Sequence, residues 1–281
     1  MIDLAPRNPN PLELETPLLA AAGSLGYGVE VARQIGLGKR GAAHGLGAII
    51  TRTTTPLPRR GRPLPALLEV PAGALYTGGN QNPGLRVVLE RFAPVWATWE
   101  LPVLLSIAAA DAEELVETVA ELDLLEGVRG LELPLGAMDM LLPGPAASLV
   151  GALRAATPLP LIVKLPGHAP DLVALAQAVE AAGADAVSLI GPLPAAAPGT
   201  AGLVEGALCG PALRPLALRA VAMVAAAVEV PVVGGGGVMT LADARALLDA
   251  GARAVALGTA LLSDLRAAAR IAAGLTGALT P

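Results

Sequence analysis

Short apolar runs alternate with longer helical segments along most of this chain. The runs predict strands at 17–22, 47–51, 102–107, 129–133, 160–165, 185–190, 230–233 and 252–257. Strands that alternate with helices in this way form a parallel sheet. A barrel of eight strand–helix units usually takes about 250 residues, which suits a chain of 281 residues. The pattern therefore predicts an α/β protein, a (β/α)8 TIM barrel, with residues 1–281 in a single domain.

The segments between these strands divide into expected helices and expected loops. Helical patterns occur at 29–37, 83–96, 111–124, 145–156, 170–182, 214–228, 240–251 and in a closing helix that runs to about 273. Residues 56–82 and 191–213 are rich in proline and glycine and predict long loops, and residues 1–16 predict a short entry strand or lid. An open doubly wound sheet is the alternative. No GxGxxG fingerprint opens the chain, and this favours the barrel.

The stretch 230–261 contains the clearest functional pattern. An apolar run leads into glycines 234–237, and the helix that follows opens at Thr240 with Asp243 three residues later, close to a capping box. The next strand leads into the glycine loop 258–260. Two such loops at neighbouring strand ends predict a phosphate site, because free N–H groups and helix dipoles attract anions. A purely structural glycine turn is the alternative.

Composition narrows the possible partners and compartments. The net charge is −5, aromatic residues make up 2% of the chain, and no basic block is present, so a nucleic-acid partner is not expected. The single cysteine, Cys209, excludes an internal disulfide and a cysteine-based metal centre, and a small packed side chain is its expected role. The N-terminus lacks a signal-peptide pattern, and no apolar run reaches membrane-helix length. We therefore expect a soluble, cytoplasmic protein.

Few polar residues follow the predicted strands, where a barrel of this kind has its site. Lys164 ends an apolar strand and is expected to present a cation to the mouth, and Arg52 follows an earlier strand in the same way. Glu132 lies within a strand, and its side chain either reaches the mouth or belongs to a polar network in the core. His168 is expected at the rim and His44 in a surface loop. No Ser–His–Asp set, metal site or catalytic carboxylate pair can be assembled, which indicates that a cofactor carries the chemistry.

Several motifs, in order along nearly the whole chain, resemble those of the dihydroorotate dehydrogenases, which are FMN-dependent (β/α)8 barrels of pyrimidine biosynthesis. Residues 20–26 (AAAGSLG) resemble the first flavin loop, and TRT at 51–53, QNPG at 81–84, VKL at 163–165, AAGAD at 181–185 and CGPALRP at 209–215 resemble further motifs. The closest class is the soluble one whose catalytic subunit partners an iron–sulfur flavoprotein. The resemblance implies FMN as the cofactor. It also implies the cofactor-binding residues Ala22, Gly23, Arg52, Thr53, Lys164, Gly210, Gly236, Gly237, Gly258 and Thr259.

The departures from the family pattern fall where orotate would bind. The family's base cysteine is replaced by Ala137, and its flanking asparagines by Pro134 and Asp139. Glycine at position 191 and Tyr76 stand where further asparagines are expected. Arg52 takes the position of a catalytic-loop lysine, and the two side chains are not equivalent. Loss of several hydrogen bonds, each worth about 1 kcal/mol or more, would remove useful affinity for a polar substrate.

The sequence thus predicts an FMN-binding oxidoreductase whose activity on dihydroorotate is altered or lost. Asp139, Ser106 and Tyr76 are the candidates for proton transfer. A non-catalytic barrel that acts as a structural or regulatory partner is the alternative, and a sugar-phosphate enzyme without flavin is a third interpretation. We expect a homodimer or a complex with a related or electron-transfer subunit, a small-molecule substrate and no metal.

Overall fold

The computed structural model describes residues 1–39, 43–62, 65–120, 122, 126–138, 140–200 and 202–276. Eight parallel strands close into a barrel in the order β10-β13-β14-β3-β4-β7-β8-β9. They are β3 (Leu18–Ala20), β4 (Ala48–Ile50), β7 (Val103–Ser106), β8 (Gly130–Pro134), β9 (Leu161–Lys164), β10 (Ala186–Leu189), β13 (Val232–Gly235) and β14 (Ala254–Leu257). The predicted TIM barrel is confirmed, and closure rules out the open doubly wound sheet.

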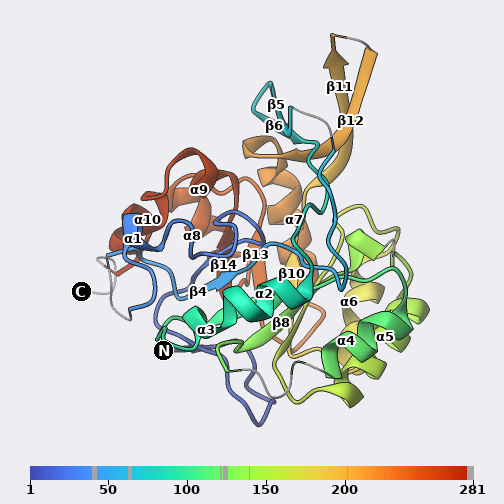
Figure 1. Ribbon diagram of the computed structural model, residues 1–281. Helices are drawn as coiled ribbons and strands as arrows, with labels where there is room; N and C mark the ends of the chain where they lie inside the picture. The colour runs from blue at the N-terminus through green and yellow to red at the C-terminus, as the bar shows by residue number, and fades with distance from the viewer. Residues whose placement is uncertain are drawn as a thin grey trace.

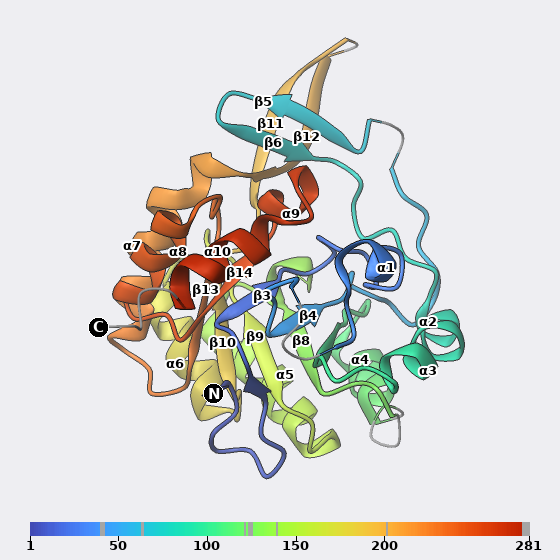
Figure 2. The ribbon, with the colours of Figure 1, turned by 90° about the vertical axis from the view of Figure 1, so that its left-hand side faces the viewer.

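Helices surround the barrel, as Figures 1 and 2 show. They are α1 (Ala32–Ile35), α2 (Leu85–Arg91), α3 (Ala93–Trp96), α4 (Ala112–Ala120), α5 (Pro143–Ala156), α6 (Leu172–Ala181), α7 (Arg214–Ala225), α8 (Leu241–Asp249), α9 (Thr259–Ser263) and α10 (Ala267–Thr276). The helix predicted at 83–96 is divided at Phe92, whose ring stacks on Tyr27 with centroids 4.6 Å apart. No helix among the described residues is long and apolar enough to cross a membrane.

The segment 1–16 closes the amino end of the barrel. It forms a hairpin of β1 (Ile2–Asp3) and β2 (Glu13–Leu14), which pair antiparallel. Leu4 and Leu12 are buried in one cluster with the barrel residues Leu104 and Ile162. Residues of this cluster come from alternate positions of the strands and face the barrel interior, whereas the larger cluster lies between strands and helices. The hairpin therefore acts as an apolar plug opposite the carboxyl ends of the strands.

The two predicted long loops are largely a second sheet, so that prediction is wrong in this respect. Segment 56–82 contains β5 (Leu67–Val70) and β6 (Gly73–Tyr76), and segment 191–213 contains β11 (Leu193–Gly199) and β12 (Gly202–Cys209). The four strands pair in the order β11-β12-β6-β5. Figures 1 and 2 show this sheet beyond the barrel, on the side away from the N-terminal hairpin. Both segments follow barrel strands, so the sheet stands at the carboxyl-end face.

His44 departs from the expected surface position. Its side chain is buried; Nδ1 accepts a hydrogen bond from the Leu46 N–H, and Nε2 lies 3.1 Å from the Lys39 carbonyl oxygen. Burial is the largest influence on the pKa of His44 and lowers it. The ring thus has a structural role, because it links the backbone at Lys39 to the backbone at Leu46.

Candidate functional site

The two C-terminal glycine loops lie side by side at the mouth of the barrel. The strands that precede them, β13 and β14, are parallel neighbours, with Gly235 in register with Ala256. The N–H groups of Gly236, Gly237, Gly258 and Thr259 donate no hydrogen bond within the described part of the chain. Gly258 directly precedes α9, so its loop ends in a helix N-terminus. Free donors of this kind on two neighbouring loops are suited to phosphate oxygens.

Glycine is required in this cradle by geometry. Gly237 has φ +76°, and a Cβ there would lie 2.8 Å from both the Gly210 carbonyl oxygen and the Arg214 nitrogen. Gly236 also has a positive φ, of +116°. The chain at Gly210 is therefore packed directly on the glycine loop. Three of the predicted cofactor residues, Gly210, Gly236 and Gly237, are brought together in this way.

A capping box fixes the helix behind the glycine loop. The Thr240 hydroxyl accepts from the Asp243 N–H, and the Asp243 carboxylate accepts from the Met239 and Thr240 N–H groups, as predicted. Arg214 at the start of α7 donates to the same carboxylate at 2.5 Å. Burial raises the pKa of Asp243, but the hydrogen bonds from Met239, Thr240 and Arg214 outweigh it, and the net pKa is lowered. An ionised Asp243 thus joins the two helices beside the cradle.

The loop after β3 continues the rim next to the cradle. The Ala21 N–H donates to the Leu257 carbonyl oxygen at 2.9 Å, so Ala22 and Gly23 follow immediately beside Gly258. A Cβ on Gly23, whose φ is +74°, would lie 3.7 Å from the Arg52 Cα. The predicted residues Ala22, Gly23 and Arg52 therefore form one continuous edge with the two glycine loops.

Hydroxyl groups line the next part of the rim. The Thr53 and Ser106 hydroxyl oxygens are 2.9 Å apart, and the Ser106 N–H donates to the Thr51 hydroxyl at 3.1 Å. Arg52 donates to the Gln81 carbonyl oxygen at 3.4 Å. Ser106 is fully buried at the end of β7. This network holds the segment after β4 against β7.

An ion pair occupies the barrel interior on the opposite side of the mouth. The Lys164 Nζ lies 2.8 Å from both carboxylate oxygens of Glu132, but only the contact with Oε1 has hydrogen-bond geometry. The Glu132 side chain is 0% exposed and that of Lys164 18%. Glu132 is in register with Ile162, one of the inward-facing residues. The predicted cation at the mouth is thus already paired, and Glu132 belongs to a buried polar contact.

Ser188 is a polar residue of this rim that the sequence analysis did not single out. It is buried on β10, in register with Lys164, and its hydroxyl makes no hydrogen bond to a described residue. A serine within the apolar strand sequence AVSL was the available signal. Gly191 lies nearby, since a Cβ on it would be 3.6 Å from Lys164 Cδ.

The candidates for proton transfer do not all lie in the barrel mouth. Ser106 lies in the barrel mouth, whereas Tyr76 lies on β6 of the second sheet and donates its hydroxyl to the Gly79 carbonyl oxygen at 2.9 Å. Asp139 lies outside the described residues. His168 is exposed after β9, and the Cys209 thiol donates to the Ala74 carbonyl oxygen. Ser106 is the candidate that the structure brings next to the Lys164–Glu132 side of the rim.

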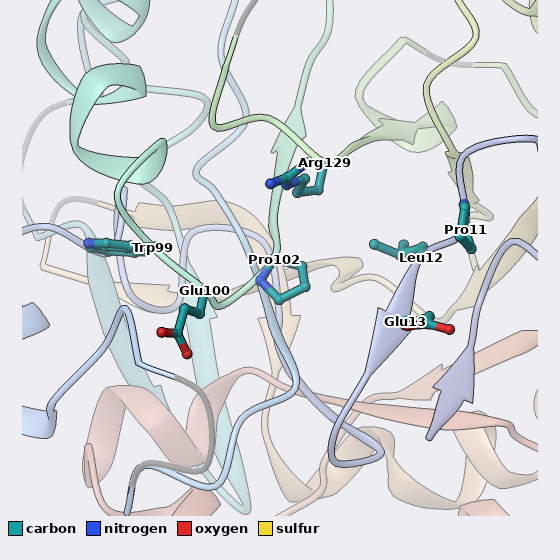
Figure 3. A pocket seen from close by; sticks show the side chains of 7 residues that line it. All are labelled: Pro11, Leu12, Glu13, Trp99, Glu100, Pro102 and Arg129. Atoms are coloured by element: carbon teal, nitrogen blue, oxygen red, sulfur yellow. The ribbon is translucent and has the colours of Figure 1, made fainter.

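A pocket of about 490 Å³ lies at the other end of the barrel. Figure 3 shows its lining, which includes Trp99, Pro102 and Arg129 together with residues of the N-terminal hairpin. Pro102 and Arg129 directly precede β7 and β8 and so mark the amino ends of these strands. This pocket is therefore separate from the rim of glycine loops and polar residues.

The chain matches one protein family over nearly its whole length. The family model described as dihydroorotate dehydrogenase matches residues 8–279. The catalytic subunit of dihydroorotate dehydrogenase B (NAD(+)) from Desulforudis audaxviator is 40% identical, over 96% of this chain and 90% of its own length. The subunits of the same name from Trichlorobacter lovleyi and Geobacillus kaustophilus are 38% and 36% identical, over 94% and 90% of this chain and 90% and 83% of their own lengths.

Proposed function

Since the chain belongs to the dihydroorotate dehydrogenase family, we propose that it binds FMN at the carboxyl end of its barrel and acts as an oxidoreductase on a substrate other than dihydroorotate. The observation that carries the FMN proposal is the set of four free N–H groups at Gly236, Gly237, Gly258 and Thr259. Their loops have no Cβ at three of the four positions, so an anion can approach the backbone closely. The residues present therefore fit the phosphate of FMN.

The remaining predicted cofactor residues fit the rest of such a ligand. The rim continues from the cradle through Ala22 and Gly23 to Arg52, Thr53 and, across the mouth, Lys164. When bound, FMN supplies the two-electron chemistry that this set of side chains lacks. The protein's own part is to hold the phosphate by backbone donors and to place cations and hydroxyl groups around the mouth.

The proposal of a different substrate rests on the residues at the opposite end. Pro134 is in register with Lys164, and Gly191 packs against the lysine stem, where the family pattern has amide side chains. Proline and glycine offer no side-chain hydrogen bond, so a polar ring such as orotate would leave its donors and acceptors unpaired. A less polar substrate suits this mouth better.

Proton transfer would then depend on the polar groups that remain. The Ser106 hydroxyl is buried and lies within hydrogen-bond distance of the Thr53 hydroxyl. Ser106 is also in register with Glu132, so it is the candidate next to the Lys164–Glu132 pair. Tyr76 and Asp139 stay candidates from the sequence. The relatives are named as catalytic subunits, so we include in the proposal a complex with an electron-transfer subunit, in addition to a homodimer.

The experiment that tests this proposal is an absorption spectrum of the purified protein, before and after loading with FMN and removal of free cofactor. A bound-flavin spectrum is expected. Anaerobic dihydroorotate is then added, and the flavin absorbance is expected to persist. Rapid bleaching would refute the altered substrate specificity. Absence of bound flavin in both preparations would refute the cofactor and favour a non-catalytic barrel that acts as a structural partner.

A further inference from the structure

A buried carboxylate stands behind the cation at the mouth. Glu132 is fully buried in the barrel interior, in register with Ser106 on one side and Ile162 on the other. Its Oε1 accepts from Lys164, and its Oε2 accepts no hydrogen bond within the described chain. Both oxygens lie 2.8 Å from the same ammonium, so Lys164 is the cation on which this buried carboxylate depends.

Stability alone gives little reason for this pair. A buried ion pair is often no more stabilising than apolar residues of the same volume. Ser106 and Ser188 lie in the same layer, in register with Glu132 and Lys164, but neither carries a charge, so the ion pair is the charged element among these four buried or half-buried residues. An ionic contact at the layer nearest the mouth therefore points to a role toward what binds there.

We propose that Glu132 is a positioning residue that holds the Lys164 ammonium at the mouth and cancels its charge, and thereby sets the electron affinity of the bound flavin. The proposal rests on the FMN binding proposed above. Reduction by two electrons adds negative charge to a flavin ring, so an unpaired lysine beside it favours the reduced form. A carboxylate 2.8 Å from the ammonium opposes that effect.

The test measures FMN affinity and reduction potential in four forms of the FMN-loaded protein. These are the wild type, Glu132→Gln, Lys164→Met and the double variant. Affinity is measured by quenching of FMN fluorescence, and the potential by equilibration with a reference dye under dithionite. Glu132→Gln is expected to favour the reduced flavin at least tenfold, a rise of about 30 mV for a two-electron couple. Lys164→Met is expected to lower the potential by a similar amount, and the double variant to lie between them.

The possible results separate the inference from the function on which it rests. A purely structural Glu132 would weaken FMN binding without moving the potential, and that result overturns the inference while FMN binding stands. An unchanged or lower potential in Glu132→Gln overturns it too. If Glu132→Gln does not fold, the potentials of Lys164→Met and of the double variant, which has no unpaired charge, decide the question. A wild type that binds no FMN overturns the proposed function and the inference together.

Discussion

The two ends of the candidate site are built from different materials. At the proposed phosphate end, the free donors belong to the backbone of Gly236, Gly237, Gly258 and Thr259, and the shape of the loops would make the site. At the substrate end, recognition depends on side chains, and Pro134 and Gly191 supply none that can hydrogen-bond. A binding site formed by backbone N–H groups depends on the conformation of its loops and on glycines that allow this conformation. A site made of side chains can change its ligand through a few substitutions, without loss of the barrel.

The largest expected effect is at the Lys164–Glu132 ion pair, which lies beside Pro134 and Gly191. Lys164→Met leaves the fully buried Glu132 without its partner, and breaking a buried pair in this way costs about 3–5 kcal/mol. Urea unfolding of the cofactor-free protein measures the loss. The matched control is the double variant with Glu132→Gln, which should recover most of the stability. Equal stability of Lys164→Met and wild type would contradict the view that the pair is buried and coupled.

A single added methyl group at Gly237 is expected to disrupt the proposed phosphate site. Gly237→Ala places a Cβ 2.8 Å from the Gly210 oxygen and the Arg214 nitrogen, at a φ of +76°. We expect FMN affinity to fall on the order of 100-fold, equivalent to about 2.7 kcal/mol, measured by fluorescence titration. The matched control is Gly151→Ala in α5, where no atom lies within 4 Å of the added Cβ. That control should leave FMN affinity unchanged, and a similar loss in both variants would refute the cradle.

The helix behind the cradle should respond to pH. Because the pKa of Asp243 is lowered in the folded protein, the unfolded state takes up its proton at a higher pH, around the ordinary aspartate value of 3.8. The stabilisation is therefore present above that pH and is lost as pH falls through the folded pKa. Asp243→Asn keeps a capping side chain without the charge and should cost about 1 kcal/mol at pH 7. Unfolding free energies of both proteins should converge at low pH, and a constant difference from pH 7 to pH 3 would contradict this account.

An effect of similar size is expected at the substrate end. Ser106→Ala removes the hydroxyl that lies 2.9 Å from that of Thr53, which should cost about 0.5–1.5 kcal/mol of stability. FMN affinity should stay the same, because the phosphate cradle is not touched. Thr53→Val is the companion variant for the other side of the contact. Once a substrate is known, unchanged turnover in Ser106→Ala would exclude Ser106 from proton transfer.

Local patterns were sufficient for the barrel, the capping box and the glycine loops. Each strand is a short apolar run, and Thr240 with Asp243 forms the expected capping box. These features depend on neighbours within a few residues, so the sequence predicts them directly. The sequence also predicts the tight loop at Gly236 and Gly237, because glycine is the residue that most readily adopts the positive φ found there.

Contacts between distant segments escaped the sequence analysis. The second sheet depends on pairs such as Ala74 with Cys209, which are far apart along the chain. Prolines within β11 and glycines within β12 hid these strands, although β11 is at the edge of the sheet, where proline is tolerated. His44 was placed at the surface because a lone histidine in a glycine-rich stretch gives no sign of its burial.

The sequence by itself determined the barrel, the order of its elements and the glycine loops suited to an anion, because apolar periodicity and backbone conformation are local properties. Only the tertiary structure decided that Lys164 is paired with Glu132, that Ser188 stands beside them and that Gly210 packs on Gly237. Strand register and barrel closure bring these residues together, and neither is encoded within a single segment of the chain.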